Sequence, residues 1–221
     1  MKKLRVWDLP VRLFHWALVL LIAGAVVTAN IGGNWMEWHL RAGYAILTLI
    51  LFRMIWGVIG SVYARFANFI VGPRAILAYL RGLRSDAAVR LIGHNPLAGL
   101  SVLGLLAVVL LQAVTGLFSN DDIAIEGPLF KFISKELSDQ LTWIHSELSI
   151  NVLYGFVALH VLAIAFYYVR KKQDLLTPMI SGDVLTELDV PAAKDGVLVR
   201  LLALVVFAVC AAGVYALVKL V

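Results

Sequence analysis

The chain has 221 residues, of which 62% are hydrophobic and only 15% are charged, and its mean hydropathy is +0.90. So few charged residues cannot cover a water-facing surface of ordinary size, which excludes a typical soluble protein and indicates a polytopic membrane protein. The single cysteine, Cys210, excludes a disulfide framework and a thiolate metal cluster. The net charge of +5 comes mostly from the flanks of the apolar runs, so it does not indicate nucleic-acid binding.

Five windows of about 20 apolar residues predict membrane-spanning helices. The first four windows contain all the unusual residues, whereas the fifth is apolar on every side and suits lipid or a subunit contact. We therefore expect an all-α membrane protein, with a four-helix transmembrane core in residues 1–182 and a linker plus a fifth C-terminal transmembrane helix in residues 183–221. The windows are 13–31, 40–60, 97–118, 145–169 and 197–218.

Basic residues concentrate in the loops on one side of the predicted bundle. They lie before the first span, between the second and third spans, and after the fourth span, whereas the opposite loops are poor in them. The positive-inside rule then predicts a cytoplasmic N-terminus, five crossings and a C-terminus on the other side. The residues that carry this prediction are Lys2, Lys3, Arg5, Arg12, Arg65, Arg74, Arg81, Arg84, Arg90, Arg170, Lys171, Lys172 and Lys194.

Four histidines lie near the ends of these spans. His15 is in the first span, His39 is next to the second and His145 begins the fourth. His160 follows His145 by 15 residues, which is about 22 Å along a helix and within roughly 60° around it. We expect His15 to face His160 near the end of the bundle where the first span begins, and we call them the proximal pair. His39 and His145 should meet near the opposite end, and we call them the distal pair.

Each pair supplies two neutral imidazoles from different helices, as bis-histidine coordination of a haem iron inside a bundle requires. A metal bond also satisfies a nitrogen that would be costly to leave unpaired in hydrocarbon. Two haems at two depths would form a path for electrons across the membrane. The predicted core is therefore a haem-binding four-helix bundle.

Four segments in this order are informative together: VWDLPVRLFHW (6–16), RLIGHNPLAG (90–99), TWIH with ALHV (142–161) and LLTPMISG (175–182). With them the chain resembles the bacterial di-haem b-type cytochromes, which include the cytochrome b561 type and the membrane subunit of nickel–iron hydrogenases. The resemblance implies two b-type haems with iron, with His15, His39, His145 and His160 as ligands, in a bacterial inner membrane with the C-terminus periplasmic. Members often separate the histidines of the fourth span by about 14 residues. The separation of 15 here would need a small bulge or a shifted haem.

Arginines near the two levels are candidates for contacts with haem propionates, which are anions that pair with guanidinium groups. Arg12 lies three residues before His15, where positive-inside anchoring explains it equally well. Arg41 lies two residues after His39 and is basic on the side that is otherwise poor in basic residues. Arg53 is deep in the second span, where it either snorkels to the surface or serves the haem at the proximal level.

His94 is the remaining histidine and precedes the third span in GHNPLAG. Asn95 there suits a helix N-cap and Pro96 suits a first helical turn, so a structural role is the simpler interpretation. The sharper hypothesis is that His94 bonds a haem propionate or belongs to a quinone pocket on the cytoplasmic side.

These features favour transmembrane electron transfer through two b-type haems between the membrane quinone pool and a redox partner, with quinone suggested by the resemblance. The partner candidates are a hydrogenase-like or other dehydrogenase subunit, a cytochrome c, or superoxide; a homo-oligomer is also compatible with the sequence. Two other classes stay open. One is a haem-free ion or metal transporter that uses the intramembrane histidines, and the other is a membrane anchor subunit in which haem is only structural.

Overall fold

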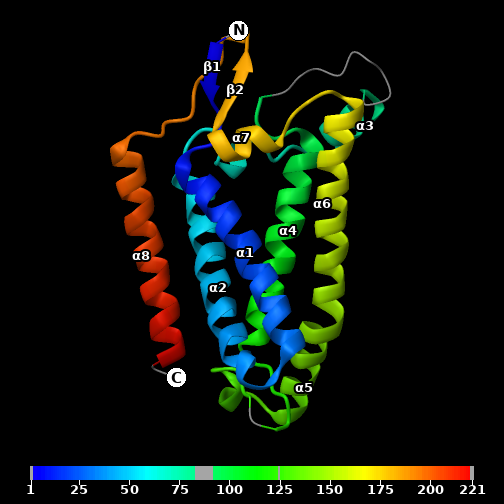
Figure 1. Ribbon diagram of the computed structural model, residues 1–221, viewed down its shortest axis with the longest axis vertical. Coiled ribbons are helices and arrows are strands. Elements are labelled where there is room, and N and C mark those ends of the chain that lie inside the picture. Colours follow the sequence, from blue (N-terminus) through cyan, green and yellow to red (C-terminus); the bar gives the residue numbers. More distant parts are fainter. Residues whose placement is uncertain (1, 83–91, 124, 220–221) are drawn as a thin grey trace.

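Five long helices form an elongated bundle with the two ends of the chain at opposite ends of it (Figure 1). The computed structural model describes residues 2–82, 92–123 and 125–219, so Arg84 and Arg90 lie outside the described residues. Five helical segments are long and apolar enough to cross a membrane, which confirms the predicted all-α membrane class. The long helices are α1 (Leu9–Ile31), α2 (Met36–Ile59), α4 (Pro96–Gly116), α6 (Ile150–Arg170) and α8 (Val197–Lys219).

Side-chain caps fix where two of these helices begin. Asp8 caps α1 by accepting a hydrogen bond from the Val11 N–H at 2.8 Å, so α1 begins four residues before the predicted start of the first span. Asn95 caps α4 in the same way, with the Ala98 N–H at 2.9 Å, and Pro96 occupies the first turn as expected. Both caps lie at the end of the bundle where α1 begins, which we call the proximal end; the opposite end is the distal end.

The fourth span is one continuous helical segment of 36 residues, Lys135–Arg170. It begins ten residues before the predicted start, because Ser134 caps α5 (Lys135–Trp143) by accepting from the Leu137 N–H. A π-helical turn, Ile144–Ser149, joins α5 to α6. A single π-helical turn accommodates one extra residue within an α-helix. The structure therefore has a bulge at His145, where the separation of 15 residues called for one.

The helices differ in how tightly they pack. α2 packs against α1, α4 and α8 and buries nine residues, whereas α6 packs against α4 and buries only Leu153 and Tyr167. Within the described chain, α1 and α6 are not among the helix pairs that pack closely. Any contact between α1 and α6 is therefore made by side chains and not by closely packed backbones.

Short elements complete the two ends of the bundle. Strands β1 and β2 pair antiparallel, with Lys2 opposite Thr186, a small sheet that the sequence did not predict. Four-residue strands separated by most of the chain carry almost no sequence signal. The short elements are β1 (Lys2–Arg5), β2 (Asp183–Thr186), α3 (Pro73–Gly82), α7 (Leu176–Ser181) and the 3₁₀ turns Gly33–Trp35, Phe66–Asn68 and Phe130–Phe132.

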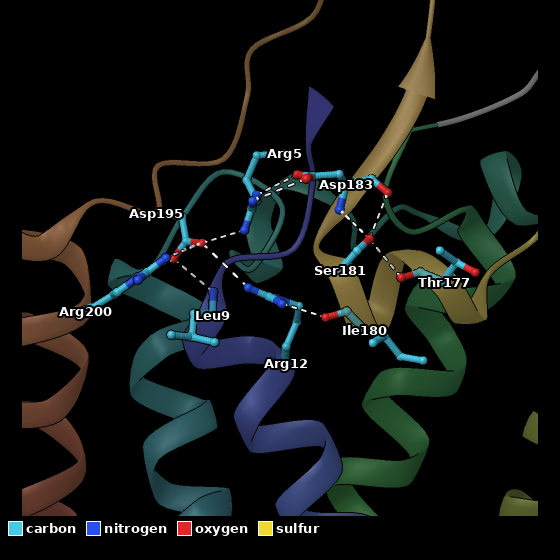
Figure 2. Close-up of polar contacts among 9 residues, drawn as sticks. All are labelled: Arg5, Leu9, Arg12, Thr177, Ile180, Ser181, Asp183, Asp195 and Arg200. Atoms are coloured by element: carbon cyan, nitrogen blue, oxygen red, sulfur yellow. Dashed lines mark hydrogen bonds and ion pairs between the residues drawn. The ribbon is translucent and has the colours of Figure 1, made fainter. Parts of the chain in front are cut away.

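A polar cluster ties the segment before α8 to the start of α1 (Figure 2). Asp195 accepts hydrogen bonds from the Leu9 N–H at 3.0 Å and from Arg5 at 2.8 Å, and it pairs with Arg200 on α8. Arg5 also pairs with Asp183 in β2 at 2.7 Å. Contacts thus cross the predicted division at residue 182, and that division stays a prediction.

Candidate functional site

The structure brings the four histidines together in two pairs at the two ends of the bundle. In the proximal pair, His15 on α1 and His160 on α6 have ring centroids 6.5 Å apart, with planes inclined at 51°. In the distal pair, His39 in the first turn of α2 and His145 in the π-helical turn have centroids 5.9 Å apart and planes at 85°. These are the pairings that the spacing predicts.

Both separations suit one iron atom between two imidazoles. With metal–nitrogen bonds of about 2 Å, and ring centres about 1.1 Å behind the nitrogens, opposed imidazoles have centroids roughly 6.3 Å apart. The observed 6.5 and 5.9 Å lie on either side of that value. By contrast, tetrahedral zinc takes four ligands, twice what either pair supplies.

Hydrogen bonds fix the tautomer of both distal histidines. His39 Nδ1 lies 2.9 Å from the carbonyl oxygen of Ala25, and His145 Nδ1 lies 2.8 Å from that of Gln112. A carbonyl oxygen can only accept, so both Nδ1 atoms carry the proton and both Nε2 atoms keep a lone pair. A second ring nitrogen that donates to a carbonyl is the usual support for a metal-ligating histidine.

The His145 ring also lies close against α4. A Cβ atom at Gly116 would stand 2.8 Å from His145 Cε1 and 3.1 Å from Nδ1, so a larger residue would force the ring to shift from this position. Thr115 Oγ1 is 3.4 Å from the same Nδ1. α4 therefore contributes both the hydrogen-bond acceptor and the space that place His145.

The proximal end holds polar atoms that lack partners. Five buried side-chain atoms in the described part of the chain have no hydrogen bond, and all belong to residues at this end of the bundle. Buried polar groups are almost always paired, so these atoms offer hydrogen bonds to a bound molecule. The atoms are Arg12 Nε, His15 Nδ1, Arg53 Nη1, Ser61 Oγ and His94 Nδ1.

Arg53 is the most unusual of these residues. It is only 3% exposed, so it does not snorkel to the surface, and its guanidinium stacks 4.7 Å above the ring of Phe66. Its Nη1 atom remains without a partner. A buried cation is costly unless an anion compensates it; the charge of Asp8 acts on Arg53, and the two carboxylates of a haem would add to it.

His94 lies between aromatic rings, with centroids 4.7 Å from Trp7 and 4.3 Å from Phe69. Burial, followed by the positive charge of Arg53, lowers the pKa of His94 to about 3. The imidazole is therefore neutral near pH 7. Its Nδ1 atom lies buried beside the proximal level without a partner.

The two arginines that the sequence proposed for propionates lie in different settings. Arg12 Nη1 donates to the Ile180 carbonyl oxygen at 2.6 Å, and Nη2 lies 3.8 Å from Asp195 (Figure 2), while Nε stays buried without a partner. Arg41 pairs with Glu37 at 2.5 Å and lies over the Trp38 ring, with its side chain more than half exposed. Arg12 thus keeps a buried donor near the proximal pair, and Arg41 is held at the surface.

Fold and site together define a multi-pass membrane protein with paired imidazoles at two depths. Residues 6–182 match the family model described as prokaryotic cytochrome b561. The chain belongs to this family of b-type cytochromes, which are membrane electron-transfer proteins that bind haem b.

Its relatives carry related names. A protein of Bradyrhizobium diazoefficiens named "Probable Ni/Fe-hydrogenase B-type cytochrome subunit" is 26% identical over 210 residues, covering 80% of this chain and 84% of the relative. One of the same name from Azotobacter chroococcum is 26% identical over 211 residues, with 80% and 86% covered. The "Probable Ni/Fe-hydrogenase 1 B-type cytochrome subunit" of Escherichia coli K12 is 25% identical over 137 residues, covering 50% of this chain and 57% of the relative. No solved structure matches.

Proposed function

We propose that this cytochrome binds two b haems and carries electrons across the membrane between them. One observation carries the proposal: two histidine pairs, at opposite ends of one apolar bundle, each have the ring separation of a bis-imidazole iron site. His15 and His160 would hold the proximal haem iron, and His39 and His145 the distal one. When bound, haem iron supplies the one-electron chemistry.

The residues around each pair have separate tasks in this proposal. At the distal level, the carbonyl oxygens of Ala25 and Gln112 orient the rings and make Nε2 a better donor to iron. At the proximal level, Arg53 would pair with haem propionates, together with Arg12 Nε and His94 Nδ1. Arg41, already paired with Glu37, serves the distal propionates only if it leaves that partner.

The two ends of the bundle would meet different partners. Basic residues gather at the proximal end, which supports a cytoplasmic N-terminus and a periplasmic C-terminus in the bacterial inner membrane. We propose quinone from the membrane pool as one partner, near His94 and Arg53. The names of the relatives support a hydrogenase-like subunit as the other.

Absorption spectra of the purified protein, oxidised and reduced with dithionite, test this function together with a haem count by pyridine haemochrome. About two b haems per chain are expected. His160→Ala should remove the proximal haem and His39→Ala the distal haem, each leaving the other. A colourless protein from cells with ample haem would refute the proposal and favour transport chemistry at the histidines. Two haems that quinol analogues fail to reduce would indicate an anchor with structural haem.

A further inference from the structure

The π-helical turn Ile144–Ser149 contains a haem-ligand candidate, His145. A π-helical turn is rare, and it persists where other contacts hold it in place. On neighbouring α4, Gln112 makes the closest polar contacts with this turn. A role of Gln112 at the distal haem rests on the proposed function, because it presupposes that haem.

Gln112 contacts both ends of the turn. Its side-chain Nε2 donates to the carbonyl oxygen of His145 at 3.0 Å, and its Oε1 accepts a hydrogen bond from the hydroxyl of Ser149, which is fully buried. Nε2 also lies 3.4 Å from His145 Nε2, at the long limit of a hydrogen bond, so the carbonyl is its main acceptor. The side chain of Gln112 thus connects His145, near the start of the π-helical turn, to Ser149, its last residue.

The main chain of the same residue holds the imidazole. The Gln112 carbonyl oxygen accepts from His145 Nδ1 at 2.8 Å. Since the side chain and the main chain of Gln112 bind one histidine at two places, they fix both the backbone position and the ring direction of His145. A change of the side chain leaves the carbonyl in place and removes the two bonds that hold the turn against it, together with the 3.4 Å approach of the amide nitrogen to His145 Nε2.

The bulge also changes where His145 points. With one residue absorbed, the path from His145 to His160 is equivalent to 14 α-helical residues, and the two side chains come to within about 40° around the axis instead of about 60°. If the turn relaxed to regular α-helix, His145 would rotate away from His39 and from the Gln112 carbonyl. The stability of the turn therefore governs the ligand geometry of the distal haem.

We propose that Gln112, with Ser149, is a positioning residue that holds the π-helical turn and thereby sets the strength of the bond from His145 to the distal haem iron. A well-aligned Nδ1–H···O=C bond raises the basicity of Nε2, which stabilises ferric haem and lowers the reduction potential. Weakening the turn misaligns this bond, so the distal potential rises.

The test compares Gln112→Leu in the unmodified chain with the same substitution after deletion of Ser146. Ser146 is an exposed residue of the turn, and its deletion reduces the separation of His145 and His160 from 15 to 14 residues, so no bulge is needed. Redox titration of the full-length protein reports the two midpoint potentials. Electron paramagnetic resonance of the oxidised protein reports the angle between the imidazole planes, which is 85° at the distal pair.

In the unmodified chain, Gln112→Leu should raise the distal potential by the equivalent of a tenfold change in the ratio of oxidised to reduced haem, about 59 mV for one electron. The distal resonance should shift, and the proximal haem should keep its potential and its signal. In the chain without Ser146 the same substitution should have little effect. Thr48→Val is the matched control, since that hydroxyl bonds only back to the Tyr44 carbonyl on its own helix.

An unchanged distal potential in Gln112→Leu, or an equal shift with and without Ser146, would overturn the inference. Should Gln112→Leu fail to accumulate, Ser149→Ala takes its place, because it removes only one of the two side-chain bonds; a smaller shift in the same direction is then expected. The haem count of the unmodified protein separates the two proposals. Fewer than two haems there would refute the proposed function, whereas two haems with an unresponsive distal potential would refute only the role of Gln112.

Discussion

The two histidine pairs differ in what holds their rings. At the distal pair, His39 and His145 both donate Nδ1–H to backbone carbonyls of neighbouring helices. At the proximal pair, His15 Nδ1 has no partner, and unpaired buried donors of Arg12 and Arg53 lie at the same end of the bundle. The rings of the distal pair are thus held by the protein itself, whereas the proximal pair lies beside unpaired donors that a bound haem would satisfy. Four changes test this difference between the two pairs.

Arg53→Met should have the largest effect, and on the proximal site alone. Loss of a hydrogen bond to a charged group costs about 3 kcal/mol, so proximal haem affinity should fall about a hundredfold. Haem titration of the two levels measures the effect. An equal loss of affinity at both levels would contradict the contrast.

Gly116→Ala should act on the distal site. Its Cβ would stand 2.8 Å from His145 Cε1, and overpacking of this kind costs about 2 kcal/mol. Distal haem affinity should fall about thirtyfold while the proximal haem stays bound, as measured by haem content after detergent washing. Gly213→Ala on α8 is the control, since a Cβ there meets nothing within 4 Å. Distal haem retained at full occupancy would show that the position of the His145 ring does not depend on its contact with α4.

Acidification should weaken the proximal end through His94. Its pKa is about 3 in the folded protein and about 6.5 unfolded, so the unfolded chain takes up the proton first and stability falls as the pH drops below 6.5. At pH 5.5 the loss is about 1.4 kcal/mol. The charged group that acts on His94 is Arg53. Thermal unfolding at pH 7 and 5.5 should show a larger loss in the native chain than in His94→Phe.

Asp195→Asn should have the smallest effect. Burial alone would raise the pKa of this carboxyl, but hydrogen bonds from Arg200 and the Leu9 N–H, with the charges of Arg200 and Arg5, lower it. The cluster therefore contributes to the stability of the fold above pH 4, and this contribution is lost as the pH falls through the lowered pKa of Asp195. The substitution should cost about 1 kcal/mol of stability at pH 7. Hydrogen exchange at the first turn of α1 should rise, with exchange around Gln112 unchanged.

The sequence predicted the spans well because hydropathy reports directly on the lipid environment. It missed the early starts of α1 and of the fourth span, since the caps at Asp8 and Ser134 lie outside the apolar windows. The histidine pairs followed from helical rise and topology. The partners of His145 did not, because a contact between Gln112 and a residue 33 positions away has no local pattern; the one available signal was the separation of 15 residues.

The bond between Arg5 and Asp195 joins residues 190 positions apart. At a synthesis rate of about 5–20 residues per second, Asp195 leaves the ribosome about 10–40 s after Arg5. All four paired histidines are made during that interval, and so is Gln112. The distal contacts can therefore form while the chain is still growing, whereas the cluster beside Arg12 must wait for the segment before α8. Time of assembly, as well as geometry, separates the two levels.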